Sequence, residues 1–331
     1  MKIIKPSATL MEHNVTPYEF IEKVGRTCYK SEDKITEGSA VGFVKNLVKR
    51  DHWAMLEHET IYLDMDYVFM TNILNAFAYA GEIPKFFNMT FDSANHEYIL
   101  SGSFRSFYDL FKLGLKDVSI RALQEMLTKK YPEVFGGLKY EPLNFIYNHN
   151  CRVLTREEFK KFKRPEVLFK HLTHTFLFVC DRGVTHEFVR HRVASFAQES
   201  TRYCNYEKDK FGGEITVIEP FFFMPDGDKV TTENWSERYG AWKHSCEVAE
   251  ESYFRIIRDG GTPQEARAVL PHSLKTELIV TATEEEWQHI VDLRYIGVTG
   301  APHPQIKEVM ELALDDLMNE TLCRVNIADK E

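Results

Sequence analysis

Four short stretches of the chain carry the pattern of β-strands. In residues 59–65, threonine, tyrosine and aspartate alternate with isoleucine, leucine and methionine. Residues 2–10, 174–180 and 276–282 are also predicted to be extended. The chain therefore combines strands with the helices that its other segments predict.

Helices are predicted where apolar residues recur about every 3.6 positions or where capping residues open such a repeat. The longest, at residues 233–258, ends at Gly260 and Gly261. Thr262, Pro263 and Glu265 form a capping box that opens a short helix and places Arg267 on a rigid element. Further helices are expected at residues 16–29, 39–49 and 304–322, and after Thr185 as a cap.

One predicted helix carries an arginine on its apolar face. Thr283 and Glu286 cap this helix, and Trp287, Ile290, Val291 and Arg294 follow at positions i, i+3, i+4 and i+7. An unpaired charge among apolar side chains costs several kcal/mol. We therefore expect Arg294 to meet an anion or a polarised carbonyl.

Residues 66–170 hold no recognisable chemical motif. Aromatic-rich helical segments are expected near residues 68–79 and 104–113, and a charged stretch covers residues 156–164. Because no Pro/Gly/Ser linker sets this part off, we interpret it as an insertion of unknown role within a single domain of residues 1–331.

Composition narrows the possible functions. With 331 residues and 44% hydrophobic residues, the chain can bury a substantial core. The net charge of −9 disfavours general binding to nucleic acids or membrane surfaces, so an anion must be met locally. No apolar run reaches about 18 residues, and residues 1–10 lack the apolar core of a signal peptide, which predicts a cytoplasmic protein.

Cysteines and histidines do not predict a metal centre. The 6 cysteines form no CxxC pair and are expected to be buried thiols. A zinc site could use His171 with His174, or His186 with His191, but HExxH is absent and the second pair has the wrong spacing. We therefore predict no metal.

The densest chemical signal lies at residues 190–203. On a helix, Arg190, His191 and Arg192 would point about 100° apart and could touch different parts of a large ligand, or two ligands. Beyond them polar residues alternate, as in an extended stretch along a phosphate or a base. An anion or nucleotide site is predicted. The alternative is a solvated basic face in which Glu187 pairs with Arg190 or His191.

The same segment resembles the RHRxxS…SxRY signature of flavin-dependent thymidylate synthases. The matching residues are Arg190, His191, Arg192, Ser195, Ser200, Arg202 and Tyr203. Residues 266–271 are similar to the family's ARxxLP element, residues 52–58 to its HxxxxEH element and residues 25–29 to an early arginine-aromatic segment. Arg294 falls at the spacing of the catalytic arginine. The similarity covers roughly residues 20–60 and 172–312.

The resemblance implies an α+β fold with a long insertion, and usually a homotetramer with FAD, deoxyuridylate and folate meeting where subunits join. It implies methylation of dUMP to dTMP, with methylenetetrahydrofolate as the carbon donor and NADPH-reduced FAD as the hydride source. Arg294 would be catalytic. The implied dUMP contacts are Glu187, Arg190, Gln198, Glu199, Ser200, Thr201, Arg202, Arg267 and Arg294, and the implied FAD contacts are His52, Arg190, His191, Arg192, Gln198, Thr283, Glu285 and His289.

Several of these positions depart from the family's better-known pattern. Ala197 and Gln198 replace an Asn-Glu pair, Glu199 replaces an apolar residue and Glu187 stands where glutamine is common. Thr283, Glu285 and His289 replace Asn, Arg and Asn, which bears on the flavin contacts rather than on the phosphate arginines. Two other classes remain open from the residues: a metal-dependent nucleotide hydrolase and an RNA-binding module, and the acidic net charge speaks against the latter.

Overall fold

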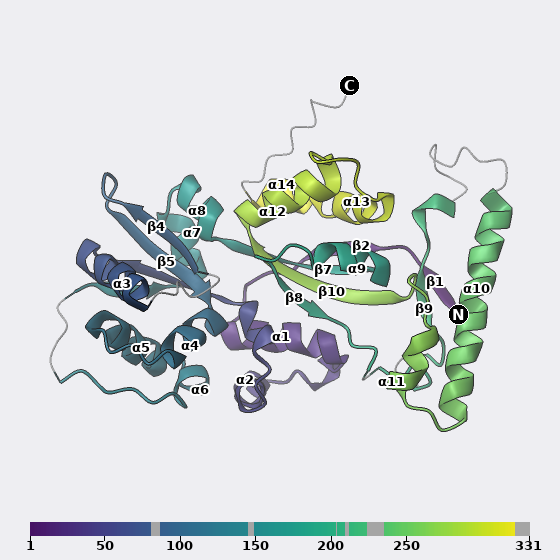
Figure 1. Ribbon diagram of the computed structural model, residues 1–331, viewed down its shortest axis with the longest axis horizontal. Coiled ribbons are helices and arrows are strands. Elements are labelled where there is room, and N and C mark those ends of the chain that lie inside the picture. Colours follow the sequence, from purple (N-terminus) through teal and green to yellow (C-terminus); the bar gives the residue numbers. More distant parts are fainter. Residues whose placement is uncertain (81–86, 145–148, 203, 209–211, 224–234, 322–331) are drawn as a thin grey trace.

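The computed structural model describes residues 1–80, 87–144, 149–202, 204–208, 212–223 and 235–321. Its strands form a central sheet, a second sheet and a two-stranded ribbon (Figure 1). The strands are β1 Lys2–Ile4, β2 Ser7–Leu10, β3 Thr60–Met65, β4 Phe87–Asp92, β5 Glu97–Ser103, β6 Cys151–Leu154, β7 Thr173–Asp181, β8 Ser195–Gln198, β9 Thr216–Ile218 and β10 Lys275–Thr283. The helices are α1 Pro17–Tyr29, α2 Ser39–Lys49, α3 Tyr67–Ala80, α4 Phe104–Lys112, α5 Val118–Lys130, α6 Pro132–Phe135, α7 Arg156–Phe162, α8 Pro165–His171, α9 Arg182–Phe188, α10 Trp235–Arg258, α11 Pro263–Ala266, α12 Glu284–Val291, α13 Pro304–Glu311 and α14 Leu314–Glu320. This mixture of helices and sheets confirms the predicted α+β class.

The central sheet has the strand order β2-β7-β10-β8, and every pair in it is antiparallel. Side chains of alternate residues point to opposite faces. On one face, Phe178 and Leu278 pack in a core with α9, α12, α13 and α14. On the other face, Ala197 and Ile279 pack against α1. The two faces therefore offer separate surroundings for the predicted site residues.

The second sheet, with the order β4-β5-β3-β6, lies beside the central one (Figure 1). Its core is rich in aromatic residues from β5, α3, α4 and α6, among them Phe104, Phe107 and Phe135. Most of this region falls within residues 66–170, although β3 precedes them. That these residues are an insertion in one domain stays a prediction.

A third core joins β1, β9, α10 and α11. β1 and β9 pair in parallel, and Tyr253 of α10 is buried with Val217 and Leu274. The aromatic side chains of α10 thus include core residues, as its periodicity predicts.

The two larger sheets meet along a seam of buried polar side chains. Thr60 Oγ1 and the Tyr62 hydroxyl of β3 lie 3.2 Å and 3.3 Å from Thr173 Oγ1 of β7. His58, just before β3, places its Nδ1 2.8 Å from Thr281 Oγ1 of β10. Burial lowers the pKa of His58 to about 3, so the imidazole is neutral at physiological pH. The hydrogen bonds between the two sheets therefore join neutral groups, and they leave no unpaired charge buried there.

Three sequence expectations need correction. Residues 2–10 form two strands in different sheets, because the chain leaves β1 before Pro6 and its ring cannot donate to a ladder. The cap of α9 is Asp181, whose side chain accepts from the Val184 amide, and Thr185 lies within the helix. The predicted last helix is two helices, α13 and α14, that break between Glu311 and Leu314, and residue 322 lies outside the described residues.

The other elements that were predicted agree with the pattern. Thr16 and Thr262 each close a capping box, and α1, α2, α3, α4, β3, β7 and β10 fall within a few residues of their predicted bounds. The charged stretch at residues 156–164 forms α7 and leads into α8. For α10, residues 233 and 234 lie outside the described residues.

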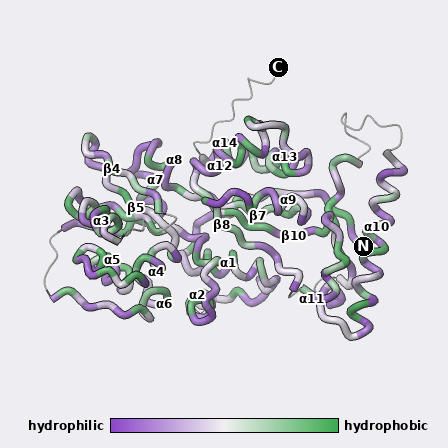
Figure 2. Tube along the Cα trace, viewed as in Figure 1, coloured by the Kyte–Doolittle hydropathy of each residue, from purple (hydrophilic) through white to green (hydrophobic). Residues whose placement is uncertain are grey.

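Hydrophobic and hydrophilic stretches interleave along the trace (Figure 2). Among the described residues, no helix is long and apolar enough to cross a membrane.

Candidate functional site

Arg294 lies where α12 continues into a π-helix, Asp292–Ile296, closed by a 2.8 Å bond from the Gly297 amide to the Asp292 carbonyl. Its guanidinium donates three hydrogen bonds: Nε to His191 Nε2 at 3.1 Å, Nη1 to Glu187 Oε2 at 3.1 Å and Nη2 to the Glu187 carbonyl at 3.0 Å. The side chain is 18% exposed. The arginine is therefore held in a fixed orientation and still has an edge open to solvent.

The basic triplet, which the sequence predicts on a helix, lies outside any helix. α9 ends at Phe188, and Arg190, His191 and Arg192 occupy the turns between this helix and β8. Arg190 and Arg192 are exposed, whereas His191 is buried beneath them. In the described part of the chain neither arginine forms an ion pair, so both cations are available to an anion.

Glu187 pairs with Arg294 rather than with Arg190 or His191. The solvated face of intrahelical ion pairs is therefore not the arrangement observed. Glu187 contributes both its carboxylate and its carbonyl, which fixes the guanidinium at two points.

The segment after the turn is extended only as far as Gln198, where β8 ends. Gln198 Nε2 lies 3.2 Å from Thr185 Oγ1 and 3.3 Å from Thr276 Oγ1, on the α9 face of the central sheet. Ser200 then leaves the strand and donates its amide to the Cys28 carbonyl at 3.2 Å. Thr201 is buried, Arg202 is exposed in a turn, and Tyr203 lies outside the described residues. The alternation predicted beyond Ser195 therefore stops before Ser200.

Glu199 points to the opposite face of the sheet. Its carboxylate lies 3.0 Å from Lys275 Nζ, and Lys275 lies 2.6 Å from Glu277. Burial alone would lower the pKa of Lys275, but the charges of Glu199 and Glu277 outweigh burial and raise it. Lys30 also pairs with Glu277, so Glu199 belongs to a buried ionic network.

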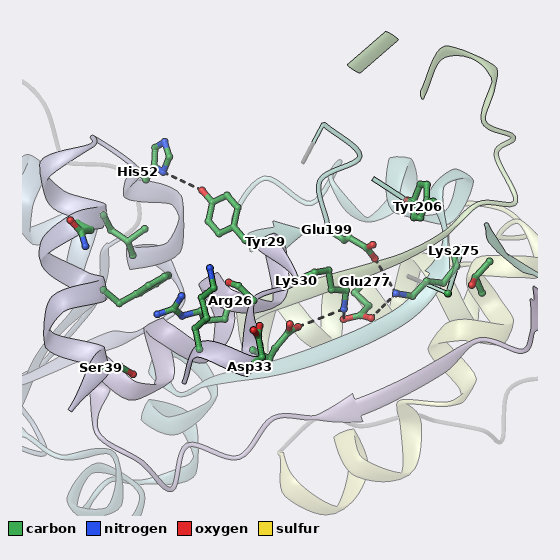
Figure 3. Close-up of a pocket in the computed structure, with 18 of the residues that line it drawn as sticks. Arg26, Tyr29, Lys30, Asp33, Ser39, His52, Glu199, Tyr206, Lys275 and Glu277 are labelled. Atoms are coloured by element: carbon green, nitrogen blue, oxygen red, sulfur yellow. Dashed lines mark hydrogen bonds and ion pairs between the residues drawn. The ribbon is translucent and has the colours of Figure 1, made fainter. Parts of the chain in front are cut away.

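This network lines one wall of a groove of about 1350 Å³ between α1, α2 and β10 (Figure 3). The opposite wall carries His52, whose Nδ1 lies 3.1 Å from the Tyr29 hydroxyl. Arg26 faces the same groove and is paired with the buried Glu22 at 2.8 Å. The groove thus unites His52 and Glu199, two predicted ligand contacts, with the early Arg-aromatic segment.

The positions expected to contact flavin at residues 283–289 are placed by α12. Thr283 caps the helix, Glu285 is exposed, and the ring of His289 lies 5.6 Å from that of His191. Glu286 was not predicted as a site residue, yet its carboxylate lies 3.4 Å from His191 Nδ1. Its only sequence signal was a Thr-x-x-Glu pattern, which indicates a helix cap.

The predicted site residues therefore fall into two groups on opposite faces of the central sheet. On the α9 face the structure brings together Glu187, His191, His289 and Arg294, and Gln198 lies on the same face beside Thr185. On the α1 face it brings together His52 and Glu199. Arg267 is exposed at the start of the short 3-10 helix Arg267–Val269 that follows α11. Of the zinc pairs weighed from sequence, His171 and His174 have other partners, since His171 bonds to Ser101 and His174 to Glu284.

Comparison with known proteins bears directly on the α9 face. Residues 158–321, which include all of α9, β8 and α12, match the family model described as thymidylate synthase complementing protein. Over these residues the chain is similar to that family. The family resemblance predicted from the RHRxxS…SxRY motif is thereby confirmed.

Curated relatives carry the name flavin-dependent thymidylate synthase. The protein of Pyrococcus furiosus is 33% identical over 130 residues, 39% of this chain and 49% of the relative, and that of Pyrococcus horikoshii is 34% identical over the same shares. The chain thus spans about half the length of the curated relatives it matches. A solved structure of a UMP/dUMP methylase PolB from Streptomyces cacaoi, bound with 5-Br dUMP, is 15% identical over 96% of this chain and 93% of that chain, with a TM-score of 0.41.

Proposed function

We propose that this chain is a flavin-dependent thymidylate synthase. It would methylate dUMP to dTMP, with methylenetetrahydrofolate as the carbon donor and NADPH-reduced FAD as the source of hydride. The observation that supports this most directly is the hydrogen bond from Arg294 to His191, because it joins the arginine expected to be catalytic to the basic motif 103 positions away.

Arg294 would stabilise negative charge that develops on the uracil. A guanidinium keeps its charge at any relevant pH and donates in a fixed plane, which suits a preorganised electrostatic contact. Glu187 and His191 hold that plane before substrate arrives, so little reorganisation is needed during the reaction.

The dUMP phosphate would be met by the exposed guanidinium groups of Arg190, Arg202 and Arg267. The remaining contacts we assign to dUMP are Glu187, Gln198, Glu199, Ser200, Thr201 and Arg294. Ser200 would bind rather than attack, since its hydroxyl oxygen accepts from the Arg202 amide and no general base is bonded to it among the described residues.

The residues assigned to FAD are His52, Arg190, His191, Arg192, Gln198, Thr283, Glu285 and His289. They fit such a group because Arg190 and Arg192 are exposed cations that can meet its diphosphate. Glu285 cannot pair with phosphate, so we assign its carboxylate to hydroxyl or amino donors of the cofactor. Bound and reduced, the flavin would supply hydride, and the chain's own residues would bind and orient the base.

We further propose a cytoplasmic homotetramer with sites where subunits join. His52 lies on the opposite face of the central sheet from His191 and His289, so one chain does not surround a single cofactor. Val189 and Val193, which flank the exposed arginines, are 47% and 58% exposed. A second copy would cover these apolar side chains and could supply the missing wall.

The proposed route uses no enzyme thiolate. Burial raises the pKa of Cys28 and of Cys151 to about 12, raises that of Cys246 to about 11, and also raises that of Cys180. A thiol that stays protonated at neutral pH is a poor nucleophile. These four cysteines are therefore unsuited to attack on the uracil ring.

The decisive experiment is a visible spectrum of the purified chain, followed by product analysis. We expect the absorption of bound flavin, or its appearance on adding FAD, and faster NADPH oxidation when dUMP is present. With methylenetetrahydrofolate also present, dTMP should form, and omission of any one component should stop it. A chain that is colourless, takes up no added FAD and forms no dTMP would overturn the proposal. The comparisons favour neither a nucleotide hydrolase nor an RNA-binding module.

A further inference from the structure

Beyond the proposed flavin reaction, one cluster has the composition of a metal site. His191, Glu286 and His289 each place one ligand atom within 4.8 Å of those of the other two. We infer that these three side chains bind a divalent transition-metal cation through two imidazole nitrogens and one carboxylate oxygen. The inference rests on this cluster and does not require that the chain binds flavin.

Two of the three side chains come from a rigid helix. Glu286 and His289 are three residues apart on α12 and so lie on one face of it. α12 is anchored between them by Trp287, which is fully buried and donates its indole N–H to the His174 carbonyl at 3.0 Å. The spacing of these two groups is therefore set by the helix.

The carboxylate of Glu286 is directed at the cluster rather than at the helix end. At Thr16, Thr155 and Thr262, the glutamate three residues on bonds back to the cap amide. At Thr283 only half of this box is present in the described structure: the hydroxyl accepts from the Glu286 amide at 3.3 Å. The Glu286 carboxylate instead lies 3.4 Å from His191 Nδ1.

The three side chains of the cluster differ in solvent exposure. His191 is buried, Glu286 is half-buried and His289 is exposed. A cation could therefore enter from the His289 side, and water could complete its coordination. Imidazole nitrogen with a carboxylate oxygen suits Zn²⁺, Co²⁺, Ni²⁺ or Fe²⁺ rather than Mg²⁺ or Ca²⁺.

The proton on His191 links this site to Arg294. A guanidinium only donates, so the bond from Arg294 requires a lone pair at His191 Nε2 and places the ring proton on Nδ1. A cation bound at Nδ1 displaces that proton to Nε2, where it opposes the Arg294 N–H. Cation binding and this one hydrogen bond are therefore mutually exclusive, whereas the two contacts with Glu187 can remain.

The test is titration of the chelator-treated, flavin-free full chain with Co²⁺, followed by visible absorption and by calorimetry. We expect one Co²⁺ per chain. Both Glu286→Gln and His289→Asn should weaken binding by at least about 10-fold, the lower end of what disturbing even an outer-shell partner costs. Glu285→Gln makes the same charge change one residue away and should leave binding unchanged, as should His244→Asn on the exposed face of α10.

Arg294→Met provides an independent readout, because it removes the competing hydrogen bond and should tighten Co²⁺ binding. Absence of saturable binding, or equal affinity in the parent, Glu286→Gln and His289→Asn, would overturn the inference. Circular dichroism of each variant separates loss of ligand from loss of fold. Since dTMP formation is not measured here, failure of the metal site and failure of the proposed synthase activity are seen in different assays.

Discussion

The two four-stranded sheets of this molecule use charged side chains in different ways. In the second sheet, Asp64 pairs with Arg152 and Lys163, and Arg164 lies 2.6 Å from Glu97. Beside the central sheet, Arg190 and Arg192 are exposed with no ion pair among the described residues, and Arg294 is aligned by its neighbours.

The difference separates structural charges from charges that can serve a ligand. The cations of the second region are matched by carboxylates and gain little from binding an anion, whereas Arg190 and Arg192 can neutralise a phosphate. Arg294 is matched only in part, by Glu187, and keeps an exposed edge for a ligand. The second sheet instead surrounds a core of phenylalanines. We therefore expect changes in the second sheet to affect stability, and changes beside the central sheet to affect activity.

The largest effect is expected from Phe107→Ala on α4, in the core beside the second sheet. Phe107 is fully buried and its ring lies 4.8 Å from that of Phe87, so truncation should lower the free energy of unfolding by about 3–5 kcal/mol. Urea denaturation measures this. Tyr79→Ala, at a side chain that is 98% exposed in the same region, should change stability by less than about 0.5 kcal/mol. Equal losses in both variants would show that this region lacks a packed core.

Arg294→Ala should lower dTMP formation by about 100-fold, because one preorganised electrostatic contact is lost. FAD content should stay at the parental level. Arg294→Lys should recover little, since an ammonium lacks the planar pair of donors. The control is Arg255→Ala, at an arginine that is 79% exposed on α10. Near-parental turnover in Arg294→Ala would remove this residue from the mechanism.

The smallest effect concerns pH and His171, which ends α8 and lies 2.8 Å from Ser101 of the second sheet. Burial, together with the nearby charges of Lys170 and Lys163, lowers the pKa of His171 to about 3. Between this value and about 6.5, the unfolded chain binds a proton that the folded chain does not, so stability should fall as pH falls. From pH 7 to pH 5 this amounts to about 2 kcal/mol. Urea denaturation of His171→Asn should show a correspondingly flatter pH dependence, while a slope equal to the parent's would mean that the folded chain protonates His171 readily.

Local chemistry explains which elements could be predicted from sequence. Capping residues such as Thr16 and Thr262 act within three positions, so they mark helix starts without knowledge of the fold. The end of α9 at Phe188 was missed because neither glycine nor proline follows it. The basic triplet was therefore assigned to a helix when it occupies turns.

The grouping of the site residues could not be predicted for a different reason. The contact between His191 and Arg294 spans 103 positions and depends on how α9 and α12 pack on one face of the sheet. Motif spacing identified both residues but could not show that His52 lies on the other face. The sequence pattern Thr283-x-x-Glu286 predicts a helix cap. The same pattern occurs whether the glutamate bonds to the cap amide or points elsewhere, so the sequence could not reveal the contact of Glu286 with His191.

The π-helix at Asp292–Ile296 has a consequence for chain length. A π turn accommodates one residue more than an α turn between bonded groups. Deleting one residue just before Arg294 would let the chain return to α geometry with little rotation of the segments on either side, because the π turn already absorbs one extra residue. Only the residues within the turn, Arg294 among them, would face in new directions. Trp287 and its core contacts lie upstream and would stay in place, while the guanidinium of Arg294 would swing away from Glu187. Within this π-helix, deletion of one residue is therefore enough to separate Arg294 from Glu187, although neither residue is substituted.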